Sequence, residues 1–188
     1  MDVGLHSRWI TASYSIGRIG EDPFGAYLTV HIQSLGRLDC VLRDQDEEIA
    51  ELFEDAGENQ EPTWTLDDYI MLSRLWVLDG YEFLRTARNT IRAGLWAPPQ
   101  AVTGDIARVE GLFKSIRVPL AKYEPAFRTG KAAPGDIVPE PVFVPGRGAG
   151  WDIGDRTPNV IARNDLADAL LRSLERARGA HSAIPATK

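Results

Sequence analysis

The stretch from Ile70 to Gly94 decides how this chain is built, and it reads IMLSRLWVLDGYEFLRTARNTIRAG. At heptad spacing it alternates large residues with small ones. The large positions are Ile70, Val77, Leu84 and Ile91, and three positions after each of them lie Ser73, Gly80, Ala87 and Gly94. Large side chains beside nearly bare backbone allow a second helix to approach closely. The pattern therefore predicts one half of a tightly packed helical hairpin.

A second helix with a complementary pattern is predicted to begin at Thr103. Its apolar residues recur at helical spacing and are all large, namely Ile106, Val109, Phe113, Ile116 and Leu120. Together the two segments predict an antiparallel α-helical hairpin over residues 65–122. We expect Ile116 to lie over Gly80, so that a large side chain fills the space above bare backbone.

The first helix of this hairpin has two halves of different character. From Tyr69 to Leu78 it is apolar on nearly all sides. A helix with a single buried face carries polar residues on the other side, so we expect residues 69–78 to be buried on two sides. Beyond Gly80 the outer positions become polar, with Arg85, Arg88, Asn89 and Arg92.

Residues 1–43 are predicted to form antiparallel strands. Residues 8–19 are rich in β-branched and aromatic side chains, and residues 26–33 and 37–42 alternate around Ser34-Leu35-Gly36. A three-residue loop with Gly36 in the left-handed conformation places six apolar residues on one face: Leu28, Val30, Ile32, Leu38, Cys40 and Leu42. In this register His31 lies on the opposite face from Cys40, so no Cys/His nucleophilic pair is expected.

The remaining segments complete an α+β fold. Residues 44–57 predict an acidic helix, and residues 129–162 an extended connection rich in glycine and proline, with short strands near 142–144, 151–153 and 159–161. A C-terminal helix is expected over 164–178, followed by a flexible tail over 179–188. The sequence thus predicts a single α+β domain over 1–178: a small antiparallel sheet with a long packed α-helical hairpin and a C-terminal helix.

Composition limits the functions that this chain can have. Its 188 residues are 44% hydrophobic and 26% charged, which is typical of a globular protein. A single cysteine allows no intrachain disulfide and favours a cytoplasmic location. The longest apolar stretch contains Arg74, Asp79 and Glu82, so we expect no membrane crossing. The three histidines lack ligand spacing, and we predict no metal, no cofactor and no catalytic residue.

Acidic residues are concentrated in one segment. The net charge is −6, and residues 44–61 contain nine acidic residues and no basic one, so the rest of the chain is net basic. Two interpretations stay open: a solvated acidic helix face, or a docking strip for a basic partner. Any contact with nucleic acid would have to lie elsewhere, because phosphates require a basic surface.

A basic constellation near the end of the hairpin supplies the candidate binding residues. Arg117 is followed by Val-Pro-Leu-Ala-Lys-Tyr123-Glu124. This segment resembles the HEPN helical ribonucleases, in which an arginine and a histidine a few residues later contact RNA. Tyr123 stands where that family has histidine, and a tyrosine with a pKa near ~10 does not shuttle protons at neutral pH. The resemblance implies RNA binding with the catalytic histidine replaced.

The ridge formed by Arg85, Arg88 and Arg92 would then hold phosphates. The alternative interpretation is a solvated face, with Arg117 neutralised by Asp79 or Glu82 across the hairpin.

Weighing these patterns, we expect a non-enzymatic protein-interaction or oligomerisation module. Apolar helix surface is plentiful, whereas no cluster of titratable groups resembles a catalytic site. The expected partner is another protein or a second copy, without a membrane. The alternative is an RNA-binding or RNA-cleaving protein of HEPN-like type. A small-molecule pocket lined by Trp64, Trp76 and Tyr81 is a third hypothesis.

Overall fold

The computed structural model describes residues 2–14, 23–54, 65–122, 140–153 and 159–182. These segments contain five helices: α1 (Val3–Ser13), α2 (Pro23–Glu54), α3 (Leu66–Arg92), α4 (Gln100–Lys122) and α5 (Arg163–Ser182). They also contain three strands, β1 (Glu140–Val144), β2 (Gly148–Asp152) and β3 (Val160–Ala162), which form one antiparallel sheet in the order β1-β2-β3. The predicted α+β class, with a small antiparallel sheet and a C-terminal helix, is confirmed.

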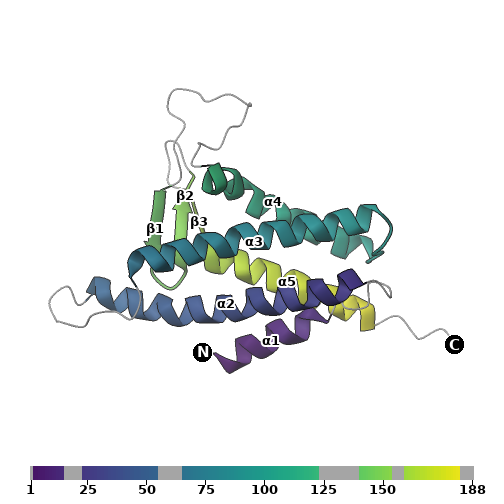
Figure 1. Cartoon of the computed structure of the whole chain (residues 1–188), viewed down its shortest axis with the longest axis horizontal. Helices are drawn as coiled ribbons and strands as arrows, with labels where there is room; N and C mark the ends of the chain where they lie inside the picture. Colours follow the sequence, from purple (N-terminus) through teal and green to yellow (C-terminus); the bar gives the residue numbers. More distant parts are fainter. Residues whose placement is uncertain (1, 15–22, 55–64, 123–139, 154–158, 183–188) are drawn as a thin grey trace, which may run out of the picture.

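Long helices form the body of the molecule, and the sheet lies at one end of them. In Figure 1 helix α3 runs between α2 and α4, and the sheet stands beside the starts of α3 and α5. Strand β2 packs against α2, α3 and α5, so the sheet closes that end of the helical layer. None of the helices in the described part of the chain combines the length and apolarity needed to cross a bilayer.

The helical hairpin is confirmed, with a register that differs from the prediction. Helices α3 and α4 pack along their length, and Gly80 is buried at their contact. A Cβ atom placed on Gly80 would lie 2.6 Å from Cε1 of Phe113, so Phe113 rather than Ile116 fills this space. The Phe113 ring also packs 5.8 Å from the ring of Trp76, centroid to centroid. An aromatic ring can therefore cover the bare backbone and meet a second aromatic at the same time.

Gly94, the last small position of the heptad pattern, does not belong to the helix contact. It is exposed, its φ is +72°, and nothing lies within 4 Å of a Cβ placed on it. It follows Ala93, the C-cap of α3, where a left-handed residue ends a helix and glycine adopts that conformation without strain.

The predicted strands over residues 1–43 are wrong where the structure describes them, because residues 3–13 form α1 and residues 23–43 belong to α2. Residues 1 and 15–22, which include part of the strand expected over 8–19, lie outside the described residues. Val30, which the strand register placed in the core, is 61% exposed. The buried side chains of α2 instead follow helical spacing, namely Leu28, Ile32, Leu35, Leu42 and Ile49. Gly36 is not a turn residue: it lies within α2, where a Cβ would overlap the side chain of Trp9 from α1. The glycine permits close helix packing rather than a change of direction.

The boundaries of the other predicted segments also shift. The acidic helix expected over 44–57 is continuous with α2, which is described to Glu54. The C-terminal helix begins at Arg163 and continues through Ser182, so residues 179–182 of the expected tail are helical. Residues 55–64 and 183–188 lie outside the described residues.

Short strands occur where the extended connection over 129–162 predicted them. Strands β1 and β2 form a hairpin in which Val142 pairs with Gly150, and β2 pairs with β3 through Trp151 and Ile161. The turn between β1 and β2 contains Gly146, whose φ is +71°. Residues 123–139 and 154–158 of this region lie outside the described residues.

Candidate functional site

Helix α3 leaves an apolar strip on its outward side. Met71 is 50% exposed and Leu75 is 49% exposed, and they lie one helical turn apart. Leu72 and Leu78 flank them and are partly buried. We call these four residues the outer stripe. The inner side of the same helix is buried against the core through Ser73, Trp76, Val77 and Gly80.

The outer stripe corrects one expectation from the sequence. Residues 69–78 were expected to be buried on two sides, yet the fold covers only one of them, because Met71 and Leu75 remain half exposed. The start of helix α3 is explained by its N-cap residue. Thr65 is the N-cap, and its hydroxyl oxygen accepts a hydrogen bond of 3.1 Å from the backbone N–H of Asp68.

Carboxylates stand at both ends of the outer stripe. Asp67 and Asp68 lie in the first turn of α3 and are exposed. At the other end Asp79 lies one turn beyond Leu75, and its Oδ2 is 2.9 Å from Nε2 of His31 on α2. Glu82 follows, and the guanidinium groups of Arg85 and Arg117 pair with it. The apolar strip is thus bordered by acidic groups along the helix axis.

The structure places three of the predicted binding arginines, Arg85, Arg88 and Arg117, in ion pairs with nearby glutamates. Arg85 lies 2.7 Å from Glu82, and Arg117 lies 3.4 Å from the same carboxylate. Arg117 also stacks 5.2 Å from the ring centroid of Tyr81. The expectation that Glu82 neutralises Arg117 across the hairpin agrees with these distances, whereas Asp79 contacts His31 instead.

The other predicted binding residues do not join that cluster. Arg88 pairs with Glu110 on α4, and Arg92 is exposed near the end of α3. Tyr123 lies outside the described residues. The ridge therefore carries less net positive charge than the sequence suggests, and its binding of RNA stays a prediction.

A buried ionic junction joins α2 to the start of α5, and sequence reasoning did not find it. Arg163 has no exposed surface, and its guanidinium lies 2.6 Å from Asp39 and 3.1 Å from Asp46. Asn164 donates a further hydrogen bond of 2.7 Å to Asp46. Asp39 also accepts a hydrogen bond of 3.0 Å from the indole nitrogen of Trp9. We call these residues the Arg163 junction.

Tyr69 connects this junction to the sheet. Its hydroxyl donates to Asp46 and accepts a hydrogen bond of 2.6 Å from the backbone N–H of Ala149 in β2. Burial, together with the negative charge of Asp46, raises the pKa of the Tyr69 hydroxyl, so the group stays protonated and keeps donating. The two buried carboxylates are paired with several donors each, which suits a structural role better than proton transfer.

Cys40 is a buried thiol on α2. Burial, assisted by the nearby charge of Asp39, raises the pKa of this thiol to about 11. At neutral pH it is therefore protonated, and a thiol is a poor nucleophile in that form.

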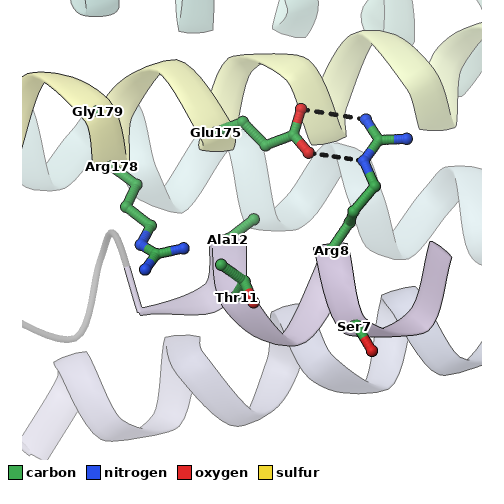
Figure 2. Close-up of a pocket in the computed structure, with 7 residues that line it drawn as sticks. All are labelled: Ser7, Arg8, Thr11, Ala12, Glu175, Arg178 and Gly179. Atoms are coloured by element: carbon green, nitrogen blue, oxygen red, sulfur yellow. Dashed lines mark hydrogen bonds and ion pairs between the residues drawn. The ribbon is translucent and has the colours of Figure 1, made fainter. Parts of the chain in front are cut away.

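Two surface hollows border the N-terminal helix. Figure 2 shows the first, about 430 Å³ in volume, between α1 and α5. Arg8 crosses it to Glu175 with two hydrogen bonds of 2.8 and 3.1 Å, so its charged groups already satisfy each other. The second, about 700 Å³, has Asp44, Glu47 and Arg43 in its wall and opens beside the Arg163 junction. Within the described ranges, no three His, Cys, Asp or Glu residues gather in a way that could hold a metal ion.

The predicted small-molecule pocket is not assembled by the described residues. Trp76 is fully buried in the core, and its indole nitrogen donates a hydrogen bond of 2.9 Å to the carbonyl oxygen of Leu35. Tyr81 packs under Arg117, and Trp64 lies outside the described residues. The chain matches no protein-family model, no curated protein and no solved structure.

Proposed function

We propose that this chain is a non-enzymatic protein-interaction module of the cytoplasm that binds its partner through the outer stripe of α3. The single observation that carries the proposal is the half exposure of Met71 and Leu75 within a segment that is apolar on nearly all sides. Soluble proteins expose single apolar residues often, but contiguous apolar strips mark interaction surfaces.

The geometry of the stripe fits helix recognition. Met71, Leu75 and Leu78 follow the spacing by which one helix face meets another helix or a groove. Completing the burial of one half-exposed Met or Leu contributes about 1 kcal/mol of binding free energy. A strip of this size therefore supports a modest affinity, which polar contacts around it would have to increase.

Other features of the molecule support a binding role over a catalytic one. The buried carboxylates Asp39 and Asp46 are held by Arg163, and the thiol of Cys40 is buried and protonated. A catalytic group needs access to substrate and a suitable protonation state. The exposed apolar residues of α3 have the access that these polar groups lack.

Site-specific photo-crosslinking in cells tests this function. A photoreactive amino acid at position 75 is expected to give a discrete covalent adduct, and the adduct should disappear when Met71→Gln is added to the same chain. Position 30 is the matched control, because Val30 is exposed to 61% and belongs to a different helix, α2. The same adduct at both positions, or none at position 75, would contradict the proposal.

A further inference from the structure

We infer that the occupant of the outer stripe is a basic amphipathic helix from a different protein, and that a second copy of this chain does not fit there. This inference rests on the proposed function. It follows from the arrangement of charges around the apolar residues of α3.

The acidic groups and the apolar centre lie on one line of the helix. Asp68, Leu75 and Glu82 are seven residues apart, so they share one side of α3. Asp79 lies beside that line, four residues after Leu75. A helix that covers Leu75 along the axis of α3 therefore passes close to carboxylates at both ends.

These carboxylates differ in how well the protein neutralises them. Glu82 is paired with Arg85 and Arg117. Asp68, by contrast, accepts a hydrogen bond of 2.7 Å from the hydroxyl of Thr65, and no cation pairs with it among the described residues. Asp79 is 52% exposed, and its one close partner there is His31, which is charged only when protonated. Asp68 and Asp79 thus present negative charge to an incoming partner.

A second copy would oppose Asp79 with an apolar side chain or with a like charge. In an antiparallel pair with its two-fold axis at Leu75, Met71 of one copy faces Asp79 of the other. In a parallel pair Asp68 and Asp79 each face their own equivalent. Both arrangements oppose association, because a carboxylate against an apolar side chain loses its water and like charges across an interface are repulsive.

A partner helix that pairs with both Asp68 and Asp79 has apolar residues in its middle and a cation near each end. Asp68 and Asp79 are eleven residues apart, which is about 16 Å along the helix axis. A docked helix therefore needs Lys or Arg residues about three turns apart, with leucine-type side chains between them at helical spacing. Charge complementarity of this kind increases the association rate and selects the partner.

The test uses the full chain and three synthetic helical peptides of equal length. All three carry the same leucine face. The first has two lysines eleven residues apart, the second has glutamates at those positions, and the third has its two lysines four residues apart. We expect the first peptide to bind at least about tenfold more tightly than either of the others, with an affinity that falls as salt rises.

Variants of the chain separate the contribution of the carboxylates from that of the apolar residues. Asp68→Asn with Asp79→Asn should remove the preference for the lysine peptide. Met71→Gln with Leu75→Gln should weaken the binding of all three peptides. Glu47→Gln is the matched control, since Glu47 is an exposed carboxylate in the wall of the second hollow. It should leave all three affinities unchanged.

Each other result overturns a specific claim. Equal binding of the lysine and glutamate peptides, lost with Met71→Gln and Leu75→Gln, would overturn the basic partner and leave the docking surface intact. A dimer in sedimentation that dissociates with Leu75→Gln would show that the second copy is the occupant. Binding of the first peptide that depends on Glu47 and not on Leu75 would indicate unspecific attraction. No binding of any peptide would contradict the proposed function itself.

Discussion

The outer stripe and the Arg163 junction differ in which kind of side chain they expose and which kind they bury. The stripe exposes apolar Met71 and Leu75 to water, whereas the junction buries Arg163 with its two aspartates. The charged side chains of the junction are paired inside the chain, whereas Met71 and Leu75 of the outer stripe remain half exposed. The comparison favours a structural role for the charged residues that look most like a site, and it makes the apolar residues of α3 the candidates for the proposed function.

Removing the buried cation should have the largest effect on stability. Arg163→Met removes the buried cation that Asp39 and Asp46 share and leaves Asp39 with the partly exposed Arg43, and breaking a buried pair typically costs about 3–5 kcal/mol in the free energy of unfolding. Urea denaturation measures this change. Arg147→Met is the control, because Arg147 is exposed and pairs with exposed Asp165, so its loss should cost under about 1 kcal/mol. Similar costs for both variants would remove the contrast between the junction and the surface.

The inner side of α3 should be the next most sensitive place. Gly80→Leu forces a side chain into the space that Phe113 occupies, and such overpacking costs about 1–3 kcal/mol. Thermal unfolding reports the loss as a lower melting temperature. Gly111→Ala on α4 is the control: a Cβ there has nothing within 4 Å, so the change should stabilise the helix slightly. An unchanged melting temperature for Gly80→Leu would contradict the observed hairpin packing.

The pH dependence of stability should show that the region around Asp39 is closed to water. The pKa of Cys40 is raised from 9.0 to about 11 by burial and by Asp39. Between these two values the unfolded chain loses the thiol proton while the folded chain keeps it, so stability falls as pH rises through this window. Urea denaturation from pH 8 to pH 11 measures the slope.

Replacing the thiol isolates its contribution to that slope. Cys40→Ala should reduce the fall in stability between pH 9 and pH 11, because other groups that titrate there are shared by both proteins. Identical slopes for the two proteins would mean that the thiol is as accessible in the folded state as in the unfolded one.

Substitutions in the outer stripe should have the smallest effect on folding. Leu75→Gln exchanges a half-exposed leucine for a polar residue of similar size, and the free energy of unfolding should change by no more than about 0.5 kcal/mol. Binding of a hydrophobic dye should nevertheless decrease. A large loss of stability would mean that Leu75 contributes to the core. The outer stripe would then be a structural region, as the Arg163 junction is.

The sequence predicted the elements whose pattern has a single interpretation. The heptad alternation around Gly80 predicted the hairpin, and the composition of residues 129–162 predicted an extended connection with short strands in the correct region. Residues 26–42 were ambiguous, because Leu28, Ile32 and Leu42 fit both a two-residue and a 3.6-residue period. Gly36 then favoured the wrong choice, since a glycine needed for contact with Trp9 looks the same as one needed for a turn.

The candidate site was predictable only in part. The apolar character of residues 69–78 was visible, but the side that the chain itself covers depends on how α2 and α4 pack against α3. The pairing of Arg117 with Glu82 was anticipated because both lie on the hairpin. The contact between Asp39 and Arg163 joins residues 124 positions apart, and no local pattern identifies such a pair.

The position of Arg163 has a consequence for the order in which the molecule is assembled. Protein synthesis proceeds from the N-terminus, so α2 leaves the ribosome long before α5. Until then Asp39 and Asp46 lack their buried counter-ion, and they are better accommodated in water than in an apolar interior. The α3–α4 hairpin can form early, because its contacts are close in sequence. We therefore expect α2 to close onto the sheet only after Arg163 has been synthesised, because Arg163 supplies the buried cation that Asp39 and Asp46 share.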